Sequence, residues 1–283
     1  MIHRIDSLAD ERIADYAHVA DSAWLLEHGL FVAEGRLVVR RLLETDRFVV
    51  RSVLVTPAAV AALASVLSSE RYRDRLPVYV CDQTVVNEIA GFNFHRGCLA
   101  LAQRPLDTVP LDRLAGSHRL LALEGVGNPD NVGGLFRVAA AFAAGGVILD
   151  QRSGDPLYRK AIRTSMGASL RVPFTRSDAW LEDLGWLQRN GMTLVALTPD
   201  ASATALRAFA AALDPAQPLV LMLGAEEPGL TAAARAAADA RVRIPISPDM
   251  DSLNVVVAGG IALATLPPVS EDPSPARHPP QAS

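Results

Sequence analysis

From residue 118 onward, the chain alternates between strand-like and helix-like segments, and this alternation limits the folds it can adopt. Strands that alternate with helices are typical of a mostly parallel sheet with helices on both faces, so an α/β fold is expected. The predicted strands are 118–123, 146–149, 170–174, 192–197, 218–223 and 241–245, and the predicted helices are 131–144, 156–164, 178–190, 202–212, 229–239 and 252–265.

A second, smaller α/β unit is predicted before this region. Its helices are expected at 7–28, 36–45, 57–69 and 82–90, and its strands at 48–56, 77–81 and 97–102. Residues 103–117 contain two prolines and a glycine, which favours a linker. The predicted division is an α/β domain at 1–105, a linker at 106–117, a second domain at 118–267 and a disordered, proline- and serine-rich tail at 268–283.

The charge balance argues mildly against non-specific nucleic-acid binding, because the net charge is −4 and such binding is mostly electrostatic. One segment of 25 residues is an exception, with six basic side chains: Arg152, Arg159, Lys160, Arg163, Arg171 and Arg176. Only Asp155 opposes them within that segment. A solvated helix face is the usual outcome of such a pattern, and a local phosphate-binding surface is the alternative.

Several other features favour a cytoplasmic protein without a metal. The histidines are scattered without ligand spacing, so no metal site is expected. Cys81 and Cys98 are too few for a disulfide framework and are expected to be reduced thiols. The first fifteen residues are acidic and have no apolar core, unlike a signal peptide. The longest apolar run, 255–267, is too short to span a bilayer.

Three segments, 128–137, 224–230 and 244–254, lie between a strand-like and a helix-like run and carry polar residues among glycines and prolines. Polar groups in buried loops need hydrogen-bonding partners. The ends of parallel strands meet at one edge of a sheet, where α/β proteins bind ligands. The three segments therefore predict a shared pocket.

Each segment also has a simpler explanation. The glycines at 125 and 127 do not continue into a dinucleotide-binding fingerprint, because the third glycine position is Asp130. Asp130 or Asn131 could be only a helix cap. Arg137 is harder to dismiss, since its apolar neighbours predict a buried helix in which an arginine needs a partner or a role.

The second and third segments likewise allow capping interpretations. Glu226 and Glu227 are adjacent in a loop and are expected to point apart, which disfavours a paired-carboxylate site. One of them could complement the helix dipole. The loop at 249–252 is predicted to cap the last helix, with Asn254 in its first turn.

In order and separation, these segments resemble the three signature motifs of the SpoU–TrmH family of RNA ribose methyltransferases, within the SPOUT superfamily. The patterns are Asn-Pro-x-Asn-x-Gly…Arg in 128–137, Gly-x-Glu-x-x-Gly-Leu in 224–230 and Ile-Pro-Ile…Ser-Leu-Asn in 244–254. Ser165–Ala168 and Pro173 resemble the family sequence between the first two motifs. The resemblance covers roughly residues 118–266.

The N-terminal unit resembles the substrate-binding domain of the same family, which is related to an RNA-binding ribosomal protein. This resemblance is less specific and depends on Phe31, Glu34-Gly35 and His95-x-Gly97. It implies a ribosomal RNA substrate in preference to transfer RNA.

The resemblance implies a deep trefoil knot in the C-terminal domain, against the general rule that chains avoid threading. It also implies S-adenosylmethionine as methyl donor, held in the knot by Gly224, Ile244 and Leu253. The enzyme is expected to be a homodimer in which each site is completed across the interface. The implied reaction is methylation of a ribose 2′-hydroxyl.

The remaining roles follow from motif position. Arg137 is expected to activate or orient the ribose, and Asn131 and Glu226 to hold Arg137 and the loops. Ser252 and Asn254 should cap the last helix and shape the donor pocket. The basic residues Arg159, Lys160 and Arg163 are candidates for RNA binding. The alternatives are a transfer RNA methyltransferase, an RNA-binding protein of the same fold that has lost catalysis, and a small-molecule α/β enzyme that uses another nucleotide.

Overall fold

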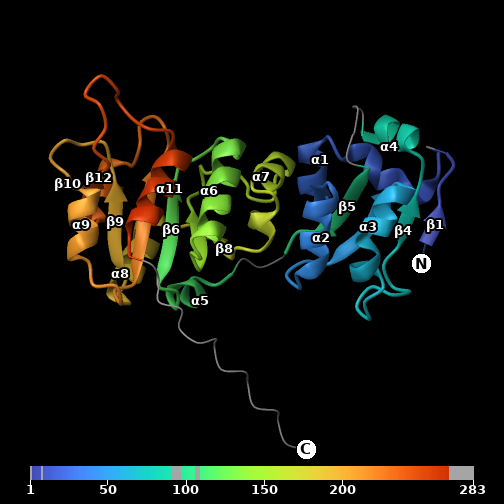
Figure 1. Ribbon diagram of the computed structural model, residues 1–283, viewed down its shortest axis with the longest axis horizontal. Coiled ribbons are helices and arrows are strands. Elements are labelled where there is room, and N and C mark those ends of the chain that lie inside the picture. Colours follow the sequence, from blue (N-terminus) through green and yellow to red (C-terminus); the bar gives the residue numbers. More distant parts are fainter. Residues whose placement is uncertain (1, 8, 91–96, 106–108, 268–283) are drawn as a thin grey trace, which may run out of the picture.

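The computed structural model describes residues 2–7, 9–90, 97–105 and 109–267. Within these ranges the chain forms two sheets, which lie side by side along the long axis of the molecule (Figure 1). The predicted tail at 268–283 and His95 lie outside the described residues. None of the helices in the described ranges has the length and apolarity that a membrane crossing requires.

The N-terminal unit is a five-stranded sheet with helices on both faces. Its elements are β1 Ile2–Arg4, η1 (a 3-10 helix) Glu11–His18, α1 Ser22–Glu27, β2 Leu30–Glu34, α2 Arg36–Glu44, β3 Val50–Val55, α3 Pro57–Leu67, β4 Val78–Val80, α4 Gln83–Ala90 and β5 Cys98–Gln103. The strand order is β1-β4-β3-β5-β2, and β5 is antiparallel to both of its neighbours. One face packs against α2 and α3, and the other packs against η1 and α1.

The continuous helix predicted at 7–28 is wrong, because the segment forms η1 and α1 with a turn between them. Asp10 accepts a hydrogen bond from the backbone N–H of Arg12 at 3.0 Å. Asp21 accepts from the N–H groups of Ala23 and Trp24, both at 3.0 Å. Each aspartate therefore begins its own short helix, as N-cap side chains do.

The C-terminal unit is a seven-stranded parallel sheet with the order β10-β12-β9-β11-β6-β7-β8. Its strands are β6 Arg119–Glu124, β7 Gly146–Leu149, β8 Phe174–Arg176, β9 Thr193–Leu197, β10 Thr204–Ala205, β11 Leu219–Gly224 and β12 Ala240–Arg243. Its helices are α5 Leu111–Ala115, α6 Pro129–Ala141, α7 Arg159–Thr164, η2 (3-10) Ala168–Leu170, α8 Trp180–Arg189, α9 Leu206–Ala212, α10 Ala232–Ala237 and α11 Val255–Thr265.

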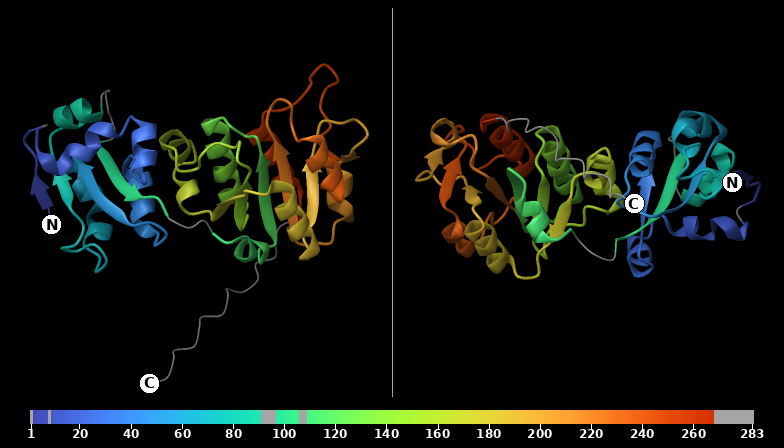
Figure 2. Two further views of the ribbon diagram at one scale, coloured as in Figure 1. Left: turned by 180° about the vertical axis from the view of Figure 1, so that it is seen from behind. Right: turned by 90° about the horizontal axis from the view of Figure 1, so that it is seen from below.

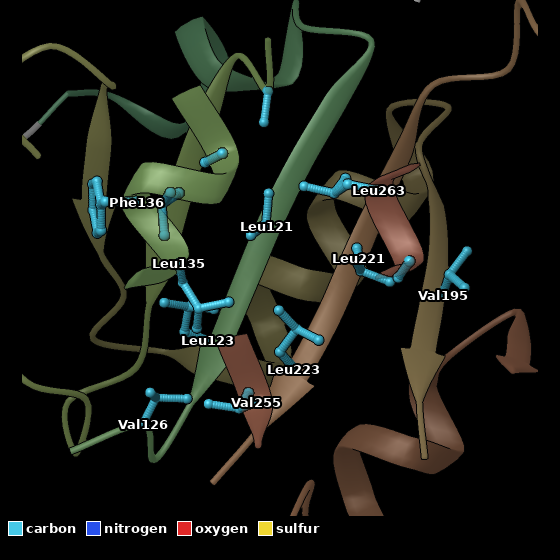
Figure 3. Close-up of a cluster of buried hydrophobic side chains, with 14 of the residues drawn as sticks. Leu121, Leu123, Val126, Leu135, Phe136, Val195, Leu221, Leu223, Val255 and Leu263 are labelled. Carbon is cyan, nitrogen blue, oxygen red and sulfur yellow. The ribbon is translucent and has the colours of Figure 1, made fainter. Parts of the chain in front are cut away.

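Helices cover both faces of this sheet, which confirms the predicted α/β class. Successive side chains of a strand point to opposite faces. Leu121, Leu123, Leu221 and Leu223 pack with α6, α9 and α11 on one face (Figure 3). The residues between them along the strands pack with α5, α8 and α10 on the other face. The central strands are thus buried on both sides, which explains their continuous apolar sequences.

Two predicted segments differ from the structure. The strand predicted at 170–174 begins later, at Phe174, because Gly167 takes a positive φ of 81° and starts the 3-10 helix η2. The predicted linker contains α5, whose Leu114 is buried in the C-terminal core. The strands β1, β2 and β10 were not predicted from the sequence.

The two units contact each other through α7 and the segment after it, as both views in Figure 2 show. Leu157, Ile162 and Leu170 belong to the same buried cluster as α2 and α3. Arg47 of the N-terminal unit donates to the carbonyl of Val172 at 2.8 Å. The C-terminal unit therefore contributes apolar side chains to the core of the N-terminal one.

Candidate active site

The site lies where β6 and β11 end beside each other. These strands pair in parallel, with Leu223 opposite Leu123 and Gly224 opposite Glu124. The loop that leads into α6 and the loop after β11 therefore leave the sheet at the same edge. α11 packs against α6 and brings the third segment to this edge.

Asn131, Glu226 and Asn254, one from each segment, form a closed set of hydrogen bonds. Asn131 Nδ2 donates to Glu226 Oε1 at 3.0 Å. Asn254 Nδ2 donates to Glu226 Oε1 and to Asn131 Oδ1, both at 3.0 Å. This amide–carboxylate triad fixes the three loops relative to one another, because each member bonds to both others.

Asn128 is the N-cap of α6. The simpler explanation, in which Asp130 or Asn131 is the cap, is therefore wrong. Asn128 accepts from the N–H of Asp130 at 2.9 Å. Asp130 instead bonds to α7, through Lys160 Nζ at 2.7 Å and Thr164 Oγ1 at 3.0 Å. The bond from Lys160 is the main reason why the pKa of Asp130 lies below its ordinary value. Asn131 is left free to bond with Glu226 and Asn254.

The cap of the last helix also differs from expectation. Asn254 is itself the N-cap of α11, and its Oδ1 accepts from the N–H groups of Val256 at 2.9 Å and Val257 at 3.4 Å. Ser252 precedes the helix and is not its cap, so that part of the prediction is wrong. One asparagine thus caps α11 through its oxygen and closes the triad through its nitrogen.

A cavity of about 390 Å³ opens beside the triad. The predicted donor-contacting residues Gly224, Ile244 and Leu253 all line it, together with Glu226 and Ser252. Its size falls in the range of small-molecule pockets, about 300–1,000 Å³. The three residues thus lie around one cavity, and their contact with a methyl donor stays a prediction.

Gly224 shapes this cavity through its lack of a side chain. A Cβ atom built there would lie 2.2 Å from the backbone nitrogen of Leu230 and 2.3 Å from the carbonyl carbon of Gly229. Backbone atoms at that distance have no room to move aside without opening the loop. The close return of the chain after β11 therefore requires glycine at this position.

A second cavity of about 620 Å³ lies on the α6 side of the triad. Asn128 and Asn131 line it, and it shares Glu226, Ser252 and Leu253 with the first cavity. Two cavities with a common wall provide separate places for two reactants, and Glu226 is the triad member that lines both of them.

Arg137 does not occupy the buried position that its neighbours suggested. Its side chain is exposed, whereas Leu135, Phe136 and Ala139 are buried. Within the described residues, no hydrogen bond or ion pair joins it to Asn131 or Glu226. The expectation that those two residues hold Arg137 is therefore not met in the single chain. Arg137 follows Asn131 by six residues, which is about 1.7 turns of an α-helix. The two side chains therefore leave the helix about 120° apart.

The known proteins most informative for this site are RNA methyltransferases. The sequence pattern of the SpoU rRNA methylase family matches residues 118–264. The chain belongs to this family. A protein of Mycobacterium bovis named as a tRNA/rRNA methyltransferase is 39% identical over 233 residues, which are 82% of this chain and 79% of that one. A 23S rRNA (guanosine-2′-O-)-methyltransferase from Burkholderia is 35% identical over 64% of this chain and 73% of its own length.

Solved structures of the family have the same architecture. An AdoMet-bound rRNA methyltransferase from Sinorhizobium meliloti has a TM-score of 0.76 and 27% identity, over 93% of this chain and 97% of that one. A TrmH-family protein from Porphyromonas gingivalis has a TM-score of 0.77 and 25% identity, over 92% and 98%. The likeness extends over both units of the chain.

The basic residues predicted to bind RNA have different surroundings in this family member. Arg159 Nε donates to Glu34 Oε2 at 2.8 Å, with both side chains largely buried between the units. Lys160 bonds to Asp130, although both side chains remain about half exposed. Arg163 is exposed. Arg159 therefore joins the two units, and only Lys160 and Arg163 remain accessible candidates.

Two acids that support the site were not singled out from the sequence. Glu124 ends β6, and its carboxylate accepts from the N–H of Thr231 at 2.7 Å and from its hydroxyl at 2.9 Å. Asp150 follows β7 and accepts from the N–H of Gly125 at 2.9 Å and of Ser153 at 2.8 Å. Each acid directly follows a run of apolar strand residues, Glu124 as the last residue of β6 and Asp150 as the first residue after β7. This position is the sequence signal that could have identified them.

Asp150→Asn is expected to destabilise the protein by about 1–3 kcal/mol at neutral pH, because a buried carboxylate with several donors is replaced. Burial alone would raise the pKa of Asp150, but the hydrogen bonds from Gly125, Ser153 and Arg152 outweigh it and lower the pKa from 3.8. A lowered pKa means that the carboxylate stabilises the fold above pH 3.8 and loses this effect as the pH falls further.

Urea denaturation of wild type and Asp150→Asn at several pH values measures this effect. The difference in unfolding free energy between wild type and Asp150→Asn should be largest at pH 7. It should become smaller as the pH falls below the ordinary pKa of an aspartate, about 3.8. Asp178→Asn, at an exposed aspartate, is the matched control. Equal stability of Asp150→Asn and wild type at pH 7 would contradict the structural role of this carboxylate.

Proposed function

We propose that this protein transfers a methyl group from S-adenosylmethionine to a ribose 2′-hydroxyl of RNA, with ribosomal RNA as the preferred substrate. The observation that carries the proposal is the triad of Asn131, Glu226 and Asn254 beside two adjoining cavities, both lined by Glu226, in a member of the SpoU family. The named activity of the Burkholderia relative supports ribosomal RNA over transfer RNA.

The cavity of about 390 Å³ fits S-adenosylmethionine in size and chemistry. Leu223, Ile244 and Leu253 give it apolar walls, and the backbone of Gly224 gives close access to hydrogen-bonding groups. The lining holds the carboxylates of Asp200 and Glu226 and the guanidinium of Arg235, so both signs of charge are present for an amino acid's ammonium and carboxylate groups. S-adenosylmethionine supplies a methyl group on a sulfonium, an electrophile that needs no metal.

Alignment is the main contribution of this chain's own residues. Positive charge is dispersed when a sulfonium loses its methyl group, so positioning outweighs charge stabilisation. Well-oriented reactants gain about 7–11 kcal/mol from positioning. The triad provides it by holding the loops around both cavities. Arg137 carries a planar guanidinium and is suited to hold the ribose or its phosphate through charged hydrogen bonds.

A homodimer is part of the proposal, with each site completed by the partner. Val257 and Ile261 on α11 are 50% and 38% exposed, and Phe142 after α6 is 38% exposed. Exposed apolar side chains on packed neighbouring helices favour a self-complementary interface. Arg137 is exposed on α6 as well, so a dimer that covers this face would surround it with groups of the partner subunit.

The trefoil knot also belongs to the proposal. After β11 at the centre of the sheet, the chain crosses to β12 beyond β9 and returns through 244–254 to place α11 against α6. Such a return brings the third segment beside the first, as a knotted donor site needs. A ribosomal RNA substrate further favours the cytoplasm as the location.

Incubation of the protein with methyl-labelled S-adenosylmethionine and unmodified ribosomal RNA tests the function. We expect label in the RNA at bonds that resist alkaline hydrolysis, because a 2′-O-methyl group blocks cleavage there. Calorimetry should show that the protein binds S-adenosylmethionine in the absence of RNA. A protein that only binds RNA does not need to bind this donor. Label in the bases, or none despite donor binding, would contradict the proposal.

A further inference from the structure

A crevice of about 180 Å³ lies between the N-terminal unit and α7, away from the cavities described above. Its lining comes from α1, β2 and α7 and from the segments beside them: Val19, Ala20, Ser22, Leu25, Leu30, Phe31, Val32, Arg104, Leu157, Tyr158, Arg159, Lys160 and Arg163. We propose that it binds one unpaired nucleotide of the RNA, with the base against its apolar wall and the phosphate against Lys160 and Arg163. This proposal rests on the proposed function.

Charge is the first reason. The lining contains four basic residues and no carboxylate, although the whole chain carries a net charge of −4. Arg104 and Arg159 are held by Asp155 and Glu34. Lys160 pairs with Asp130 at a half-exposed position, where an ion pair is weak and exchanges readily for a phosphate.

Shape and surface chemistry are the second reason. The crevice is smaller than the 300–1,000 Å³ or so of pockets for drug-sized ligands, so it takes a fragment of the size of one base. Leu25 and Leu30 are buried in its apolar wall. Tyr158 lies beside the cations with its side chain 39% exposed. An apolar wall, an accessible aromatic ring and adjacent cations are the combination with which proteins hold unstacked bases of single-stranded RNA.

The third reason is the link between the crevice and the proposed active site. α7 carries Lys160 and Arg163, and it packs closely on α6, where a Cβ on Gly133 would lie 2.5 Å from the carbonyl oxygen of Ala161. Asp130, next to the triad residue Asn131, also accepts a hydrogen bond from Thr164 of α7, which does not involve Lys160. A nucleotide bound at α7 is thus held by a helix that packs rigidly on α6, which carries the triad residue Asn131. Its position would determine which ribose of the RNA reaches the active site.

Binding of short oligomers to the full-length protein tests the crevice. The probes are fluorescently labelled oligouridine, oligoadenosine and an abasic ribose-phosphate oligomer of equal length and charge. Because base stacking favours binding, wild type should bind the two base-bearing oligomers about tenfold more tightly than the abasic one. Homopolymers are chosen because they do not require a defined register.

Ala20→Trp fills the crevice from its exposed rim, and it should abolish this preference for bases while leaving abasic binding unchanged. Ala14→Trp, also exposed on the N-terminal unit but outside the lining, should keep the preference. Arg163→Gln should weaken binding of all three oligomers by a similar factor, because it removes a phosphate contact. Thermal unfolding confirms that each variant folds.

The inference is overturned if wild type binds the abasic oligomer as tightly as the others, or if Ala20→Trp retains the preference. Methyl transfer to ribosomal RNA, measured in parallel, separates this failure from failure of the proposed function. Transfer with an unchanged preference in Ala20→Trp would reject the crevice alone. Absence of transfer by wild type would reject the function itself.

Discussion

Replacing Arg137 by alanine is expected to lower the rate of ribose methylation about 10²- to 10³-fold, the usual cost of removing one group that acts directly on the reacting atoms. Donor affinity and thermal stability should stay close to wild type. Arg137 is exposed and does not line the donor cavity, so its truncation leaves neither a void in the core nor a gap in that pocket.

Single-turnover methylation with saturating donor measures the rate, and calorimetry measures donor affinity. Arg207→Ala is the matched control, because Arg207 is an exposed arginine on α9 of the same unit. Arg137→Lys should recover little activity if the guanidinium holds its partner bidentately, since a lysine presents a single charge. An unchanged rate in Arg137→Ala would remove this residue from the mechanism.

Glu226→Ala is expected to lower the rate about 10²-fold, because it removes the common acceptor of Asn131 and Asn254 and frees the loops that both cavities share. Displacement of a reactant by about 1 Å has an effect of this size. Donor affinity should also fall, since Glu226 lines the donor cavity as well. Steady-state kinetics and calorimetry together measure both effects.

The conservative variant Glu226→Gln separates positioning from proton transfer. Glutamine keeps a carbonyl oxygen as acceptor for both amides, so positioning predicts a loss of only a few-fold. If Glu226 acted as the base that takes the hydroxyl proton, Glu226→Gln should methylate RNA as slowly as Glu226→Ala. Glu227→Ala is the neighbouring control and should have little effect on donor binding, because Glu227 lines only the second cavity.

The convergence of the three segments could be predicted from the sequence because each follows a segment that was predicted to be a strand. Parallel strands end at one edge of a sheet, so the segments were expected at the same edge. That β6 and β11 are neighbours, with Gly224 opposite Glu124, is known only from the structure. Ile244 and Leu253 could be assigned to the same pocket for this reason and through the family motifs. The bonding partners within the triad could not be predicted, because they depend on side-chain directions that no spacing fixes.

Other features depend on contacts between distant segments. The exposure of Arg137 was mispredicted because apolar neighbours on a helix do not show which side faces outward. Arg159 was counted with the RNA-binding residues because its partner, Glu34, is 125 residues away. The break between η1 and α1 follows from capping by Asp21, which competes with a continuous helix.

The most direct test compares 2′-O-methylated nucleosides in ribosomal RNA from cells with and without this protein, mapped by mass spectrometry. Our account predicts that one or a few ribose methyl groups disappear in its absence and return with the wild-type gene but not with Arg137→Ala. An identical set of ribose methyl groups in ribosomal and transfer RNA from both cell lines would contradict it.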